Sequence, residues 1–278
     1  MHLLPACQPA TMNSAKDQVL DSPELLEMIL VQMDMRSLLT SAQRVCHRWV
    51  NLINKSPSIQ KALFFTPIKD SEWGTDQKTP NPLLKEAFPS IFPAKGRQQR
   101  FEFDFSDMAI TKDASARARF VRKDASWRRM LVQQPPIRNI GLFHISHAMG
   151  GDGASTSSIP PDGKMQESGY DGIRMERLFE LLLFCNRVEF AFNTRSRVYW
   201  SCEEPISFDA SSNRNNELFY RMLSKFDLVL YTREVVQCCP RQTDPSAEEL
   251  TRREIIAAYK EHGLDAGAKS KDIERVVV

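Results

Sequence analysis

The sequence SPELLEMIL occupies residues 22–30 and has the pattern of a helix start. Serine is a common N-cap residue, proline is tolerated at the first helical position, and an acidic residue near the start meets the positive end of the helix dipole. From Leu25 to Met33, large apolar residues recur at i, i+1, i+4, i+5 and i+8 and form one broad face. The stretch therefore predicts an amphipathic helix that begins at Ser22.

Two more short helices are expected directly after the first. Asp34 can cap the second helix, and Ser56-Pro57 ends the third. Three helices with about 35 residues in total are too small to bury their large apolar side chains among themselves. A second hydrophobic surface, either the rest of this chain or another protein, is therefore expected to cover part of the cluster. The apolar residues of the second and third helices are Leu38, Leu39, Val45, Cys46, Trp49, Leu52 and Ile53.

These helices resemble the F-box motif. That motif has a first helix opened by Pro-Glu, a short Asp/Arg-Leu-Leu helix and a third helix with Val-Cys-x-x-Trp. The resemblance covers about residues 20–60, although Ser22 stands where the motif often has a leucine, which removes one apolar contact. Residues 63–67, 81–84 and 126–131 also resemble segments of fungal F-box proteins. The segments that carry the main match are SPELLEMIL at 22–30, DMRSLL at 34–39 and RVCHRW at 44–49.

The resemblance implies a function in protein recognition. In F-box proteins this cluster docks on a Skp-type adaptor, which links it to the cullin scaffold of a ubiquitin ligase, while the rest of the chain recruits a target protein. A separate enzyme carries the ubiquitin, so we expect no catalytic residue in this chain. The chain would promote ubiquitin transfer only by holding the target close to that enzyme. An F-box scaffold or regulator that acts outside a ligase is an alternative. By resemblance, the adaptor-binding residues are Pro23, Leu26, Ile29, Leu38, Leu39, Val45 and Trp49.

The apolar residues of the cluster also allow another interpretation. In that interpretation the three helices are an ordinary subdomain packed on residues 100–260, and their apolar faces are covered within the chain.

The rest of the chain predicts an α+β fold without internal repeats. A small βαβαβ unit is an alternative for residues 139–236. The isolated strand at 101–105 and the proline-rich segment before it do not fit the regular alternation of strands and helices in such a fold. Expected strands lie at 101–105, 139–146, 187–200 and 227–236, and expected helices at 81–88, 125–132, 173–185, 215–226 and 246–262. The expected organisation is a disordered N-terminus at 1–18, the F-box at 19–65, a connector at 66–100, an α+β recognition region at 101–262 with a flexible glycine-rich loop at 148–172, and a loosely ordered tail at 263–278.

Residues 117–129 concentrate positive charge, with Phe120 and Trp127 interleaved. One interpretation is a surface for a phosphorylated or acidic target, because arginine pairs with phosphate through two hydrogen bonds. A second is stacking on single-stranded nucleic acid. The interpretation that we favour is a solvated helix face with both aromatic residues turned into the core. The arginines proposed for target binding are Arg117, Arg119, Arg122, Arg128 and Arg129.

Composition argues against several function classes. The chain has 278 residues and a balanced net charge of +2, which gives no support to nucleic-acid or membrane partners. No apolar run approaches the roughly 18 residues of a membrane span, and residues 1–18 lack the basic and apolar regions of a secretory signal. We therefore expect a cytoplasmic or nuclear protein whose six scattered cysteines stay reduced.

No metal, cofactor or catalytic site is expected from the sequence. His144 and His147 are three residues apart on an expected strand, so their side chains point to opposite faces. The adjacent Cys238 and Cys239 lack the two-residue spacer typical of chelation. An enzyme with its site in residues 139–236 is a further alternative, but the convergent acids and nucleophile that it needs are not found in the sequence.

Overall fold

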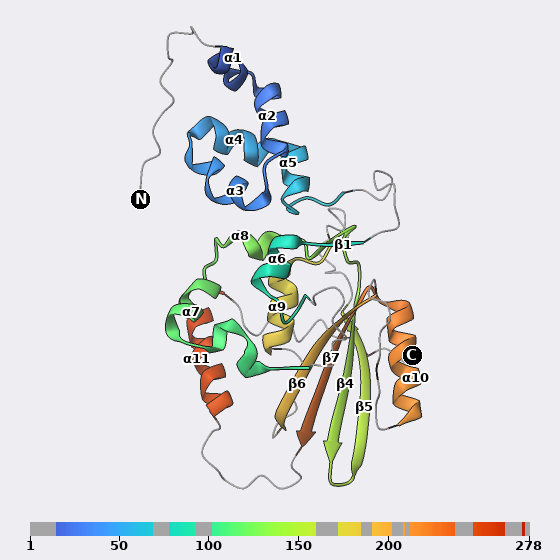
Figure 1. Cartoon of the computed structure of the whole chain (residues 1–278). Helices are drawn as coiled ribbons and strands as arrows, with labels where there is room; N and C mark the ends of the chain where they lie inside the picture. Colours follow the sequence, from blue (N-terminus) through green and yellow to red (C-terminus); the bar gives the residue numbers. More distant parts are fainter. Residues whose placement is uncertain are drawn as a thin grey trace.

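A computed structural model of the chain describes residues 15–68, 78–92, 102–159, 172–184, 191–201, 208, 212–236, 247–264 and 274–275. The predicted α+β class is confirmed. Figure 1 shows a group of short helices, α1 to α5, at one end of the molecule and a mixed sheet flanked by helices in the remainder. We call residues 15–65 the helical module and the remainder the body. Among the helices of the described segments, none combines the length and the hydropathy needed to cross a lipid bilayer.

The helical module begins its helices at the predicted caps. The Ser22 hydroxyl oxygen accepts a hydrogen bond from the Leu25 N–H at 3.4 Å, and the Asp34 carboxylate accepts one from the Ser37 N–H at 2.9 Å. Each cap satisfies a backbone donor that has no partner inside its helix. The helices are α1 (Ala15–Asp21), α2 (Pro23–Val31), α3 (Met35–Thr40), α4 (His47–Lys55) and α5 (Pro57–Ala62), with a 3-10 turn, η1, at Ala42–Arg44.

Two boundaries of the module differ from the prediction. Helix α1 begins at Ala15, inside the segment expected to be disordered, while residues 1–14 lie outside the described residues. Ser56-Pro57 ends α4 as expected but also starts α5, because the Ser56 hydroxyl oxygen accepts a hydrogen bond from the Ile59 N–H at 3.1 Å. Serine before proline is therefore used here, as at residue 22, to open a helix.

The body contains a six-stranded sheet in the order β2-β6-β7-β4-β5-β8. Strands β4 and β7 are parallel, and the other neighbours are antiparallel. The strands are β2 (Phe103–Asp104), β4 (Ile140–Ala148), β5 (Gly151–Ile159), β6 (Ala191–Trp200), β7 (Leu228–Val236) and β8 (Glu274–Arg275). A separate pair joins β1 (Thr79–Pro80) to β3 (Gln133–Gln134). This mixed order matches the expected α+β class and not a βαβαβ unit, which would need parallel neighbours throughout.

Both faces of the sheet are covered by apolar side chains. Helix α10 (Asn213–Lys225) packs on one face, where Phe219 and Met222 meet Phe143 and Tyr231 in a second apolar cluster. A Cβ atom at Gly141 would lie 2.6 Å from the Met222 Cε, so glycine permits the close approach of α10 to β4. The main core lies on the opposite face. Its helices are α6 (Pro82–Ala87), α7 (Ala114–Phe120), α8 (Ser126–Arg129), α9 (Met175–Phe184) and α11 (Ala247–Glu261), with 3-10 turns η3 (Phe105–Asp107) and η4 (Ala109–Thr111).

Three segments expected to be irregular belong to the folded body. In the expected connector, Phe88, Ile91 and Phe92 are buried, and the Ile91 carbonyl accepts a hydrogen bond from the Trp200 indole at 3.1 Å. Residues 151–159 of the expected loop form β5, and residues 274–275 of the expected tail form β8. For residues 88–92, 151–159 and 274–275 the prediction was wrong, because local composition describes only local preference, whereas distant partners fix these residues. The remaining parts of these segments, 69–77, 93–100, 160–171, 265–273 and 276–278, lie outside the described residues.

The helical module is joined to the body by backbone contacts and a continuous core. The Leu131 N–H donates to the Phe64 carbonyl at 2.7 Å, and the Gln134 side-chain amide donates to the Lys61 carbonyl at 2.9 Å. Leu63 and Phe65 are buried in the same cluster as the body residues. The end of the module near Leu63 and Phe65 is thus covered by the body of this chain. The interpretation of the module as an ordinary subdomain would require the body to cover all of its apolar faces.

Replacing Asn81 by alanine is expected to lower the free energy of unfolding by about 1–3 kcal/mol. The fully buried Asn81 caps α6 by accepting from the Leu83 and Leu84 N–H groups at 3.1 and 3.2 Å, and it donates to the Leu131 carbonyl at 3.2 Å. Chemical denaturation measures the change, and the exposed Asn51→Ala variant, expected within about 0.5 kcal/mol of wild type, is the control. If Asn81→Ala lowered the free energy of unfolding by no more than Asn51→Ala does, the structural role of Asn81 would be contradicted.

Candidate adaptor-binding surface

Exposed large apolar side chains gather on the helical module. Among the described residues, nine such side chains are exposed, and six of them lie between residues 19 and 45. The other three, Met149, Tyr220 and Leu250, are far apart in the sequence. Scattered single exposed apolar residues are normal, whereas a concentration of them indicates an interaction site. The six are Val19, Leu20, Leu25, Met28, Ile29 and Val45.

Helix α2 has two apolar faces with different roles. Leu26 and Leu30 are fully buried and face the interior of the module. Leu25, Met28 and Ile29, spaced at i, i+3 and i+4, share the opposite, exposed face, and Met28 is 67% exposed. We call the exposed residues of these two helices, Val19, Leu20, Leu25, Met28 and Ile29, the α1–α2 apolar surface. In Figure 1, α1 and α2 lie at the end of the molecule farthest from the sheet.

The structure separates the residues that were predicted to bind the adaptor. Pro23, Ile29 and Val45 are exposed. Leu39 and Trp49 are partly buried and pack against the core. Leu26 and Leu38 are fully buried, so their assignment to a partner interface is corrected: they stabilise the module from inside.

Sequence reasoning missed Val19, Leu20, Leu25 and Met28 as exposed residues. The signal was present in the periodicity of α2, because residues one position apart on a helix point about 100° apart. With Leu26 and Leu30 on the inner face, Leu25 and Met28 must point outward. Which face was inner could not be read from the sequence, since both faces of α2 are apolar.

Polar contacts hold the helices around this surface. The Arg48 guanidinium pairs with Asp21 at 2.6 Å and joins α1 to α4, and the Ser56 hydroxyl donates to the Glu27 carboxylate at 2.6 Å and joins α2 to α5. The Glu24 carboxylate accepts a hydrogen bond from its own backbone N–H and another, at 2.9 Å, from the Ser22 hydroxyl. These hydrogen bonds hold the pKa of Glu24 below its ordinary value. Ser22 therefore organises the start of α2 where the F-box motif often has leucine.

The predicted basic patch is not one surface. Arg128 is 1% exposed, and its guanidinium pairs with Glu176 at 2.7 Å and with Glu180 at 3.3 Å. Its assignment to target binding is therefore corrected to a role in the core. Arg117 pairs with Glu254 at 2.7 Å, and Arg122 pairs with Asp124 at 3.3 Å.

The remaining members of this segment fit a solvated helix. Arg119 is exposed, and the exposed Arg129 lies over the Phe65 ring at 4.7 Å. Phe120 and Trp127 are partly buried and contact Phe179, with ring centroids 5.4 and 5.2 Å apart. Both aromatic residues thus face the core, as in the interpretation that we favoured, and are not platforms for bases.

Each of the two histidines that were considered for metal binding lies beside a different carboxylate. The nearly buried His144 lies 3.0 Å from the buried Glu234 carboxylate, and His147 lies 2.7 Å from Asp152. Among the described residues, no group of three or more His, Cys, Asp or Glu side chains is placed to hold a metal ion. Cys238 and Cys239 lie outside the described residues, and Cys46 is a buried thiol.

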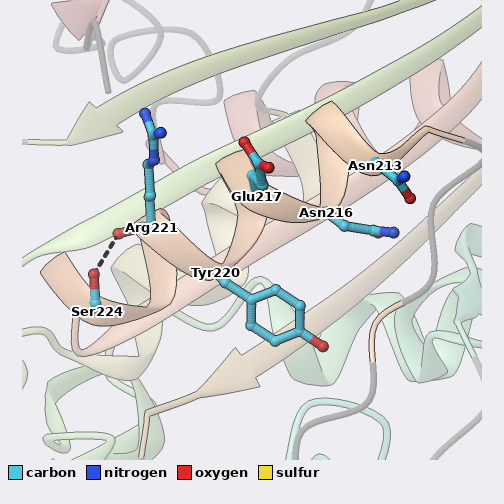
Figure 2. Close-up of a pocket in the computed structure, with 6 residues that line it drawn as sticks. All are labelled: Asn213, Asn216, Glu217, Tyr220, Arg221 and Ser224. Atoms are coloured by element: carbon cyan, nitrogen blue, oxygen red, sulfur yellow. Dashed lines mark hydrogen bonds between the residues drawn. The ribbon is translucent and has the colours of Figure 1, made fainter.

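A shallow hollow lined by polar residues lies along α10. Figure 2 shows that its lining side chains project away from one helix and come from no second element. The Ser224 hydroxyl, its most nucleophilic group, donates to the Arg221 carbonyl at 2.9 Å, and no histidine is among the lining residues. The Ser224 hydroxyl therefore donates to the backbone and not to Glu217, the carboxylate of the lining. The lining residues are Asn213, Asn216, Glu217, Tyr220, Arg221 and Ser224.

Comparison of the chain with models of protein families, with curated proteins and with solved structures finds no match.

Proposed function

We propose that the chain is a non-catalytic substrate-recognition subunit of a Skp-cullin-type ubiquitin ligase. In this proposal the helical module binds the adaptor and the body recruits a target protein in the cytoplasm or nucleus. The observation that carries the proposal is the exposed apolar face of α2, formed by Leu25, Met28 and Ile29, within helices that resemble the F-box.

The physical reason for adaptor binding is the uncovered apolar area. Leu63 and Phe65 are buried in the core that the module shares with the body, whereas the side chains of the α1–α2 apolar surface are exposed. Burying apolar surface contributes about 25 cal/mol per Å². A helical partner that lays its own apolar face on this surface would gain that contribution, which is the usual mode of helix recognition.

The connection between module and body supports a role in positioning. The Arg174 guanidinium donates to the Phe65 carbonyl at 3.1 Å, and Arg36 in α3 pairs with Glu86 in α6 at 2.6 Å. These contacts, with the Leu131–Phe64 hydrogen bond, fix the body relative to the adaptor-binding end. A target held by the body would then be kept at a defined distance from the ligase, which raises its effective concentration at the ubiquitin donor.

Co-expression of the full chain with a Skp-type adaptor tests the proposal. We expect the two proteins to co-elute as a one-to-one complex, and proteins captured with the chain to accumulate as ubiquitin conjugates when the proteasome is inhibited. Failure to form the complex under conditions in which another F-box protein binds would contradict the proposal. A complex without any ubiquitin conjugates would favour a scaffold that acts outside a ligase.

A further inference from the structure

Three arginine side chains lie together on one face of the sheet. Arg195 in β6 is directly opposite Arg233 in β7, and Arg197 follows Arg195 at the spacing that returns a strand residue to the same face. Side chains directly opposite each other on neighbouring strands are about 5 Å apart at Cβ, so like charges there destabilise the sheet. Such local conflicts are expected at functional sites. We call these three residues the arginine surface.

The arginine surface continues the sheet face on which α10 packs. Arg197 is opposite Tyr231, and both Tyr199 and Tyr231 belong to the apolar cluster under α10. The side chains of Arg195 and Arg233 are 42% and 46% exposed. Strand β7 runs away from the helical module in Figure 1, and Arg233 is in the second half of that strand. The arginine surface is therefore accessible to solvent and separate from the α1–α2 apolar surface.

Two of the three arginines pair with a carboxylate of this chain. The Glu102 carboxylate accepts hydrogen bonds from the Nε and Nη2 atoms of Arg233 at 3.1 and 2.8 Å. The Asp104 carboxylate lies 3.6 Å from the Arg195 guanidinium. This distance is longer than that of a good hydrogen bond, so Asp104 compensates the charge of Arg195 only weakly. The arginines of this face thus take carboxylates as partners.

Arg197 lacks such a partner. Among the described residues, no carboxylate forms an ion pair with Arg197, and its buried Nε atom has no hydrogen-bond acceptor. Its guanidinium lies 4.2 Å from the centre of the Tyr199 ring, a contact that orients it. Burial raises the pKa of Tyr199 to about 12, so the phenol stays neutral and does not supply the missing negative charge. Arg197 is therefore an oriented cation without a counter-charge.

We infer that the arginine surface binds an acidic protein segment and that Arg197 holds one of its carboxylates. A guanidinium can donate two parallel hydrogen bonds to a carboxylate, and Arg195 is placed to bind a second one. Glu102 and Asp104 flank the cluster and would repel a continuous polyanion, so separate carboxylates suit it better than a nucleic-acid backbone. Only the identification of this segment as part of a recruited target rests on the proposed function.

Fluorescence anisotropy with a labelled tetraglutamate peptide tests the inference, and a tetraglutamine peptide is its control. We expect the full chain to bind only the acidic peptide, and Arg197→Gln to weaken that binding about tenfold through the loss of charge-assisted hydrogen bonds. Arg253→Gln removes the same charge from an exposed ion pair of α11 and should bind as wild type does. No preference of the wild-type chain for the acidic peptide, or equal binding of that peptide by Arg197→Gln, would overturn the inference.

The Asp104→Asn variant gives a result that misfolding cannot imitate. It removes the carboxylate that competes for Arg195 and keeps the side-chain oxygen that accepts a hydrogen bond from the Ser106 N–H. We expect it to bind the tetraglutamate peptide about threefold more tightly than wild type, as loss of a weak ion pair allows. Asp124→Asn removes an exposed charge elsewhere and should have no effect. Unchanged or weaker binding by Asp104→Asn would overturn the inference.

Competition with other anions tests the carboxylate as the ligand. A peptide with two phosphoserines, which carries a similar charge, or a single-stranded oligonucleotide should displace the labelled tetraglutamate no better than unlabelled tetraglutamate does. Better displacement by either would overturn the inference. Adaptor binding is measured on the same preparations, and Arg197→Gln should bind the adaptor as wild type does. A wild-type chain that binds the acidic peptide but no adaptor would contradict only the proposed function.

Discussion

Replacing Arg128 by alanine is expected to lower the free energy of unfolding by about 3–5 kcal/mol, because it leaves a buried charge without its partner. Arg128 and Glu180 are 1% and 3% exposed, and the guanidinium also donates to the carbonyl oxygens of Arg122 and Phe120 at 3.0 and 2.9 Å. The Arg128 guanidinium lies 5.5 Å from the centre of the Tyr259 ring. One side chain thus connects α8, α9 and α11.

Denaturant unfolding measures this effect, with two variants as controls. Arg129→Ala, one residue away but exposed, should change the free energy of unfolding by no more than about 0.5 kcal/mol. The double variant Arg128→Met/Glu180→Leu should recover much of the loss, since replacing both partners with apolar groups removes the unpaired charge. If Arg128→Ala changed the free energy of unfolding as little as Arg129→Ala, the assignment of Arg128 to the core would be contradicted and Arg128 would again be a candidate for target binding.

Replacing both Met28 and Ile29 by aspartate is expected to weaken adaptor binding by about a hundredfold or more, since a hot-spot side chain contributes about 2 kcal/mol. The two residues are 67% and 43% exposed, so their substitution should leave the fold of the module intact. Fluorescence anisotropy of a labelled adaptor measures the affinity. Leu250→Asp, at an exposed apolar residue of α11, is the matched control and should bind as wild type does.

The buried residues of the module should behave differently. Aspartate at Leu26 or Leu38 places a charge inside the module, so these variants should lose helical signal and melt at a lower temperature than wild type. Their loss of adaptor binding would follow from unfolding. Unchanged melting of Leu26→Asp, with binding lost, would instead place Leu26 in the interface and contradict its assignment to the module core.

Local features of the fold could be predicted from the sequence. The caps Ser22, Asp34 and Asn81 act on backbone groups only two or three residues away, so a short window contains both partners. Gly263 ends α11 with a positive φ of 66°, as a glycine after a helix predicts. The long strands β4, β6 and β7 were expected within a few residues of their ends.

Features that depend on distant partners could not be predicted. Strand β5 has no apolar alternation, and its pairing with β4 across a short turn makes it a strand. Arg128 looked like part of a basic surface because Glu180, its buried partner, is 52 residues away. Residues 82–92 of the expected connector are packed into the body, where Phe88 contacts Phe179 with ring centroids 5.5 Å apart.

The candidate site was predicted only in part, for a related reason. The sequence indicated which helices carry apolar residues, and Ile29 and Val45 are exposed as expected. The inner and outer faces of α2 are both apolar, so only packing against α4 and α5 distinguishes Leu26 from Leu25.

The heat capacity change of adaptor binding tests most directly the central claim that a partner covers the α1–α2 apolar surface. Calorimetric titration of a Skp-type adaptor into the full chain, repeated at several temperatures, gives this quantity. We predict one-to-one binding with a negative heat capacity change, as burial of apolar surface requires, and loss of that binding in the Met28→Asp/Ile29→Asp variant. Absence of binding by the wild-type chain, or equal binding and heat capacity change in the variant, would contradict the claim.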